Sequence, residues 1–278
     1  MAKPALIGID RLSRQEQAAC LIAVRTLDAS RAEAWDVDGR QNAVDVMLTL
    51  ADGRTAAFEV TNLAADGALE TASLLARDNH KWPVPGMWFW SIDVGSPQDL
   101  RRLRQCYQKI ILICEADGIA YPQQHPSVWT PAVDPDLQWL VEHSSCTMVG
   151  HPEQLASTMQ NPGAMVVPVV GSGFIDESLS GFANELRTAF NAPHIPPHFA
   201  KLASAVADER HLFIPLHASA LPFRISSVLM FEDALPAEPP PVPAHITYLW
   251  LAPEYSRRVL LWSRLHGWRN HFPYATGP

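Results

Sequence analysis

Residues 44–61 read VDVMLTLADGRTAAFEVT, and the alternation of side chains in this stretch decides the fold that we predict. Apolar side chains occupy the even positions on both halves of the stretch. Because successive side chains of a strand point to opposite faces, these even positions form one core-facing set. The stretch therefore predicts a β-hairpin in which Asp45, Glu59 and Thr61 share the other, polar face.

The loop between the two predicted strands fixes which residues face one another. Even positions pair with even positions only across a loop with an odd number of residues, and Ala51-Asp52-Gly53 supplies three. Gly53 can adopt the left-handed conformation that a three-residue hairpin loop needs. The numbers of paired residues then sum to 104, which places Asp45 directly opposite Glu59.

Two facing carboxylates raise a chemical question about this hairpin. Cross-strand neighbours have Cβ atoms about 5 Å apart, so the two acids repel one another unless a cation or a shared proton lies between them. Oxygen ligands from two acids, with water in the remaining positions, are what Mg²⁺ prefers. The pair therefore predicts a magnesium site. An ordinary hairpin with two acids on its solvent-facing side is the simpler alternative, and the spacing alone leaves both open.

Other elements surround the hairpin in a definite order. Ser13-Arg14-Gln15-Glu16 is a capping box, which starts a helix that extends to about Asp28. After the hairpin, the patterns predict a helix over 68–80, a buried strand over 87–94 and a long helix that begins after Ser96 and ends before Gly118. The patterns of the second half predict further elements, namely strands over 146–149, 211–217, 246–252 and 259–262 and helices over 180–190 and 199–206.

This order, with Asp at the start of the first hairpin strand and Glu-x-x at the end of the second, resembles the core of the PD-(D/E)XK nuclease superfamily. The resemblance covers roughly residues 13–117. It implies an α/β fold of restriction-endonuclease-like type, with a mixed sheet flanked by helices. It also implies that Asp45, Glu59 and the backbone carbonyl of Val60 hold a Mg²⁺ ion, which supports hydrolysis of a phosphodiester in nucleic acid.

One position departs from the pattern of this superfamily. Thr61 stands where the superfamily has lysine; a threonine can orient water but supplies no positive charge. Lys81 or Arg77, on or just after the following helix, could supply the cation from a migrated position, and the alternative is a scaffold that has lost catalysis. Glu16 matches an extra helical acid of the superfamily, although its capping-box position explains it without catalysis.

The composition limits the partners and the compartment that we expect. A net charge of −8 argues against broad, nonspecific binding of nucleic acid, which needs clustered cations. Basic residues gather between Arg101 and Lys109 and between Arg257 and Arg269, where we expect solvated faces more than a nucleic-acid strip. The four cysteines lack metal-ligand spacing, and no apolar run is long enough for a membrane span. A protein of the cytoplasm with free thiols is the expectation.

The remaining polar groups and aromatic residues carry weaker signals. His211 and His217 flank an apolar strand and lie about 20 Å apart when extended, too far to share one ion. The Pro-rich segment around His194 and His198 is expected to lie in a surface loop. Asp208-Glu209-Arg210-His211 is expected to form a turn with internal ion pairs. The aromatic residues of the strands are expected to serve packing or an interface.

These observations predict an α/β fold with a core over residues 1–118 and a C-terminal α+β region over 119–278, which either completes the same core or forms a second lobe. The first function hypothesis is a metal-dependent nuclease-like protein that cleaves or binds nucleic acid, with Asp45, Glu59, Thr61 and Lys81 as site residues. The second is a catalytically inactive module that binds a protein partner. A structural oligomer, such as a dimer, is the third.

Overall fold

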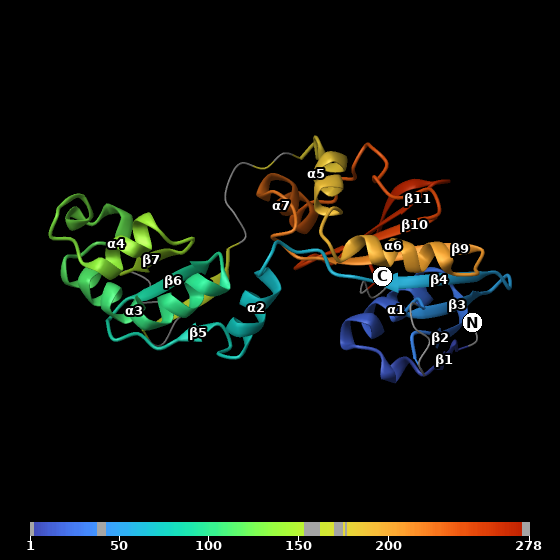
Figure 1. Cartoon of the computed structure of the whole chain (residues 1–278), viewed down its shortest axis with the longest axis horizontal. Helices are drawn as coiled ribbons and strands as arrows, with labels where there is room; N and C mark the ends of the chain where they lie inside the picture. Colours follow the sequence, from blue (N-terminus) through green and yellow to red (C-terminus); the bar gives the residue numbers. More distant parts are fainter. Residues whose placement is uncertain (1–2, 38–42, 153–161, 170–174, 176, 274–278) are drawn as a thin grey trace, which may run out of the picture. The chain divides into compact units, whose positions relative to one another are not determined.

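The structure is a computed structural model of the chain, and it describes all residues except 1–2, 38–42, 153–161, 170–174, 176 and 274–278 (Figure 1). The chain divides into two compact units. Unit 1 comprises Met1–Ala64 and Gly171–Pro278, and unit 2 comprises Ala65–Val170. Unit 2 is thus an insertion in the sequence of unit 1. The division differs from the boundary that the sequence suggested at residue 118, which falls inside unit 2.

Unit 1 is built on a mixed sheet of eight strands in the order β1-β2-β3-β4-β9-β10-β11-β12. The pairs β1/β2, β4/β9 and β9/β10 are parallel, and the other neighbours are antiparallel. C-terminal strands therefore complete the sheet that the predicted hairpin begins. The strands are β1 (Ala5–Ile7), β2 (Ala29–Ala34), β3 (Val46–Leu50), β4 (Thr55–Val60), β9 (Glu209–Leu216), β10 (Tyr248–Pro253), β11 (Val259–Ser263) and β12 (Gly267–His271).

Helices cover both faces of this sheet (Figure 1). Helix α1 packs on one face, over the apolar even-numbered side chains of the hairpin. The helices α5, α6 and α7 pack on the other face, and α6 contacts both β4 and β9. The polar face of the hairpin is therefore covered by protein and is not the solvent-facing side of the simpler alternative. The helices are α1 (Arg14–Thr26), α5 (Phe182–Ala189), α6 (Ile195–Ser204) and α7 (Phe223–Phe231).

The hairpin has the predicted register. Val46 pairs with Phe58 and Leu48 with Ala56, so the numbers of paired residues sum to 104. Gly53 has a φ of 87°, the left-handed conformation that this loop needs. The capping box at the start of α1 is also confirmed, because the backbone N–H of Ser13 donates to the Glu16 carboxylate (2.7 Å) and Glu16 N–H donates to Ser13 Oγ (3.3 Å).

Unit 2 has its own four-stranded sheet in the order β5-β8-β6-β7, with its own apolar core. The helices predicted over 68–80 and 97–117 and the strand predicted over 87–94 exist, but all three lie in unit 2. The strand belongs to this second sheet and not to the sheet of the hairpin. Ser96 caps α3 as predicted, by accepting from Asp99 N–H at 3.1 Å. The elements are α2 (Ala68–Ala76), β5 (Lys81–Trp82), β6 (Phe89–Val94), α3 (Pro97–Ala116), α4 (Pro135–Glu142), β7 (Thr147–His151) and β8 (Gly163–Pro168).

Two expectations from composition can be compared with the structure. All four cysteines are free and buried, and burial raises the pKa of Cys20 to about 11 and that of Cys114 to about 12, so their thiols are poor nucleophiles. No helix among the described residues is both long and apolar enough to cross a membrane.

Candidate functional site

The two acids of the hairpin lie at the end of the strands that is remote from the loop. Asp45 immediately precedes β3, and Glu59 is the penultimate residue of β4. Asp45 N–H donates to Glu59 Oε2 (3.1 Å), and Asp45 Oδ2 accepts from Val60 N–H (2.7 Å). Asp45 is 7% exposed and Glu59 is fully buried. The predicted facing pair is therefore present, within the protein rather than on its surface.

Helix α6 brings two basic side chains to the same glutamate. His198 Nδ1 lies 2.6 Å from Glu59 Oε1, and Lys201 Nζ lies 3.0 Å from the same oxygen. Lys201 also lies 3.5 Å from Asp36 Oδ2. Each oxygen of Glu59 thus has a donor, and the cation that contacts this glutamate comes from a residue far along the chain.

The electrostatics of the pair are unequal. Burial and then the charge of Glu59 are the main causes that raise the pKa of Asp45 to about 7; Glu16 also raises this pKa, whereas the Val60 N–H and Lys201 lower it. Burial lowers the pKa of Lys201, but the Glu59 carboxylate outweighs this effect, so the pKa of Lys201 is raised overall. Near neutral pH, Lys201 is therefore charged and Asp45 is divided between its two protonation states.

The other predicted site residues lie in different surroundings. Thr61 is buried directly after β4, and its N–H donates to Phe213 O (3.0 Å). Lys81 is an exposed residue of β5 in unit 2, where it pairs with Met165, whereas Asp45 and Glu59 belong to unit 1. The structure therefore offers a different lysine, Lys201, to the glutamate.

The predicted surface loop is present at His194, an exposed residue just before helix α6, but the prediction is wrong for His198, because the segment from Ile195 to Ser204 is helix α6. Pro196 and Pro197 lie in its first turn, where a proline costs no hydrogen bond. The spacing His-x3-His-x2-Lys places three basic side chains on one face of a helix, and this was the available signal. His194 Nε2 lies 2.9 Å from Asn62 O, so the basic face of α6 begins against the chain just after β4.

The chemistry open to this site is that of oxygen ligands. Within the described parts of the chain, no group of three or more His, Cys, Asp or Glu side chains is arranged to hold a metal ion. Two acids and a backbone carbonyl suit an ion that keeps several waters, as Mg²⁺ does. A cation bound there would compete with the proton on Asp45 and lower its raised pKa.

Several residues of the two basic clusters already have partners within the described part of the chain. In α3, Arg101 lies 3.2 Å from Glu70, Arg104 pairs with Asp78, and Lys109 lies 2.8 Å from Asp134. Arg258 is buried and donates to Ala234 O and Val228 O (2.9 and 3.2 Å), so it stabilises the end of α7.

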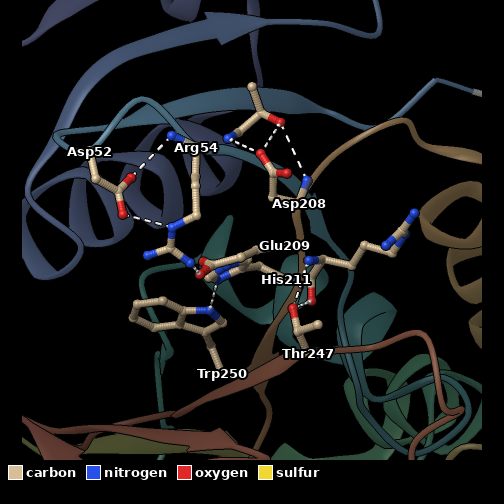
Figure 2. Close-up of polar contacts among 9 residues, drawn as sticks. Asp52, Arg54, Asp208, Glu209, His211, Thr247 and Trp250 are labelled. Atoms are coloured by element: carbon tan, nitrogen blue, oxygen red, sulfur yellow. Dashed lines mark hydrogen bonds and ion pairs between the residues drawn. The ribbon is translucent and has the colours of Figure 1, made fainter.

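A second polar cluster lies at the loop end of β4 (Figure 2). Arg54 pairs with Glu209, and Glu209 Oε2 lies 2.9 Å from His211 Nε2. Trp250 Nε1–H donates to His211 Nδ1 (3.1 Å). The predicted turn is wrong for Glu209 and His211, because both lie in strand β9, although the two side chains do contact one another; Trp250 is fully buried in the core.

The chain has no match among protein-family models, curated proteins or solved structures.

Proposed function

We propose that this protein is a metal-dependent phosphodiesterase of the PD-(D/E)XK type that acts on nucleic acid, with Lys201 in place of the lysine missing at Thr61. The observation that carries the proposal is the 3.0 Å contact between Lys201 Nζ and Glu59 Oε1. It supplies a cation beside the acid pair, from an element that the hairpin sequence does not contain.

The order of elements in unit 1 supports the proposal. Helix α1 is followed by the antiparallel strands β2, β3 and β4 and, after unit 2, by the helices α5 and α6 and then by β9, which is parallel to β4. This is the helix, strand and helix order of the superfamily once unit 2 is set aside as an insertion. Asp45 immediately before β3 and Glu59 near the end of β4 would then take the places of the superfamily's two acids.

Asp45, Glu59 and the carbonyl of Val60 would hold the metal, which when bound would activate water and stabilise charge on the phosphate. Lys201 would place a positive charge beside the reacting phosphate. His198 would hold Glu59 in its observed orientation through the 2.6 Å contact. Thr61 would orient water, since its hydroxyl both donates and accepts.

The test is cleavage of single- and double-stranded DNA and RNA in Mg²⁺ or Mn²⁺. We expect Lys201→Met to lower the cleavage rate by roughly 100-fold or more, because one charged group at a reacting centre contributes about that much. Lys109→Met is the matched control: Lys109 is an ion-paired lysine of unit 2, and its loss should leave the rate unchanged. Absence of cleavage of all four substrates in either metal would reject the proposal, and so would equal rates for the two variants.

A second candidate, a nuclease fold that serves as a non-catalytic protein-interaction module, is favoured by one observation. Glu59 already has His198, Lys201 and the Asp45 N–H as partners, so this carboxylate needs no further cation. This candidate predicts that Mg²⁺ causes no shift in thermal stability. The nuclease predicts a stabilising shift that Asp45→Ala abolishes.

A further inference from the structure

We propose that Ser219, His217 and Glu254 form a second, metal-independent catalytic site, in which Ser219 is the nucleophile in hydrolysis of a carboxylic ester. The three residues follow two neighbouring parallel strands. Leu216 and Pro253 are register partners at the ends of β9 and β10, and His217 and Glu254 come directly after them. The carboxyl ends of parallel strands are the usual place for a ligand site in an α/β sheet.

The hydrogen bonds indicate which tautomer of the neutral His217 ring fits this geometry. Ser219 N–H lies 3.2 Å from His217 Nδ1 and donates to it, so Nδ1 is an acceptor and the ring hydrogen lies on Nε2. His217 Nε2 lies 3.4 Å from Glu254 Oε2. Ser219 Oγ lies 2.8 Å from Nδ1, within reach of the same lone pair. This is a nucleophile beside a base, with an acid on the far side of the base.

The glutamate is itself held in place. Glu254 Oε2 accepts from Ala218 N–H (3.2 Å), and Glu254 N–H donates to Leu216 O (2.9 Å). The His217 side chain is only 10% exposed, whereas Ser219 is half-buried. The base is thus shielded and oriented while the nucleophile lies nearer to solvent, as the roles require.

The chain after Ser219 provides a favourable place for negative charge. Helix α7 begins at Phe223, and its N-cap is Pro222, which makes no side-chain cap. The first N–H groups of a helix have no partner within the helix, and its N-terminus carries partial positive charge. Such a terminus stabilises the oxyanion that forms when a carbonyl is attacked.

The reaction consumes one water and needs no other reagent. The Ser219 hydroxyl proton passes to His217 Nδ1 while Oγ bonds to the carbonyl carbon, and the departing alcohol takes that proton as its C–O bond breaks. A water molecule then gives a proton to Nδ1 and its oxygen to the acyl carbon. The bond to Oγ breaks, Ser219 regains the proton, and the carboxylic acid leaves.

Unit 2 contains an internal control for the possibility that the serine–histidine contact is only a local turn. Ser127 Oγ lies 2.8 Å from His125 Nδ1, and Ser127 N–H donates to the same atom at 3.3 Å. His125 Nε2 lies 2.9 Å from Asp117 Oδ2, and this contact, like the 3.4 Å contact between His217 Nε2 and Glu254 Oε2, lacks the geometry of a hydrogen bond. The two His-x-Ser turns match, and only that of His217 also has an acid that the backbone holds in place.

The test is the reaction of the full chain with a fluorophosphonate probe in EDTA, followed by peptide mapping. We expect one adduct, on Ser219, that is lost in Ser219→Ala and retained in Ser127→Ala. His217→Gln should lower the labelling rate by about 100-fold, the usual contribution of a general base. Ser219→Ala should also lose hydrolysis of p-nitrophenyl acetate, and Ser127→Ala should retain it. Circular dichroism should show that each variant is folded.

Three results would overturn the proposal: no adduct on the folded wild type, equal labelling of Ser127 and Ser219, or an unchanged labelling rate in folded His217→Gln.

Discussion

Two buried glutamates on the adjacent parallel strands β4 and β9 each contact a histidine and a cation. Their clusters differ in whether every polar group has a favourable environment. Glu59 contacts His198 and Lys201, and Glu209 contacts His211 and Arg54. The two side chains lie on opposite faces of the sheet. Glu59 shares a face with Ala57, under α6, whereas Glu209 is in register with Ala56, on the face that α1 covers.

The cluster around Glu209 is closed. Both ring nitrogens of His211 have partners, since Nε2 meets Glu209 and Nδ1 accepts from Trp250. His211 is fully buried, stacks on Tyr248 at a ring distance of 4.2 Å, and has a pKa that burial lowers despite Glu209. The hydrogen bond from His211 and the charge of Arg54 lower the pKa of Glu209. Every group satisfies another, which is what a structural network needs.

The cluster around Glu59 is open in one respect. A second acid, Asp45, lies beside the glutamate, and its pKa is raised to about 7 by burial and by Glu59. Exposure does not separate the two clusters, since the Arg54 side chain is 53% exposed and that of His198 is 23% exposed. A histidine, a glutamate and a cation therefore do not by themselves indicate a site. An acid with an unfavourable environment is what distinguishes the cluster of Asp45 and Glu59.

The largest difference in stability between the two clusters should follow from removal of the histidine of each, His211 and His198. We expect His211→Ala to lower the free energy of unfolding of unit 1 by about 3–5 kcal/mol, because it leaves a cavity and deprives Trp250 and Glu209 of a buried partner. His198→Ala should cost only about 1 kcal/mol. Urea unfolding followed by circular dichroism measures both, with hydrogen exchange in β9 to identify the transition of unit 1. Equal costs would contradict the contrast between the closed and the open cluster.

Replacement of Asp45 and of Glu209 by the corresponding amides should change the free energy of unfolding in opposite directions, and Asp45 should show the larger effect. Because its pKa is raised from 3.8 to about 7 in the folded protein, ionised Asp45 opposes folding, by an amount on the order of 4 kcal/mol that develops as pH rises from about 4 to 7. We expect Asp45→Asn to stabilise the metal-free protein by about 2–4 kcal/mol at pH 8 and to remove this loss. Urea unfolding at pH 5 and pH 8 is the measurement, and a destabilised variant at pH 8 would contradict it.

Glu209→Gln should destabilise the protein at pH 8, by about 1–3 kcal/mol, since it weakens hydrogen bonds to charged groups. The pKa of Glu209 is lowered, so its stabilising effect is present above the ordinary value of 4.5 and is lost as pH falls through the folded value. The difference between variant and wild type should therefore shrink in acid. The same urea series tests this prediction. If Glu209→Gln were stabilised at pH 8, the two clusters would respond alike and the contrast between them would be contradicted.

The sequence was sufficient for the facing acids because their relation is local. The alternation of Val46 to Leu50 and the odd length of the loop at Gly53 determine the register without any distant residue. Strand β2 escaped prediction, since its sequence ASRAEA lacks the β-branched and aromatic side chains that mark strands.

Lys201 and the insertion could not be found in the same way. Chain order does not state which strands are neighbours: β6 follows the hairpin but pairs with β7 and β8, whereas β9 lies beside β4. The prolines before His198 suggested a loop, although a first helical turn also accepts them. The basic face of α6 was visible in the sequence, but the acid that it meets depends on tertiary packing.

The smallest effect concerns Glu16, whose charge is felt at only one of the two clusters. Glu16 raises the pKa of Asp45, while it is no cause of the shift of Glu209. Glu16→Gln removes the charge and retains the capping box, because glutamine also accepts the Ser13 N–H. We expect a lower pKa for Asp45 and a gain in stability of less than about 1 kcal/mol at pH 8, the usual scale for a solvent-screened pair. The gain should vanish in the Asp45→Asn background and persist with Glu209→Gln, as a double-mutant cycle measures. If the stability gain of Glu16→Gln persisted in the Asp45→Asn background, it would arise within helix α1. The carboxylate of Glu16 would then have no electrostatic effect on Asp45 and Glu59.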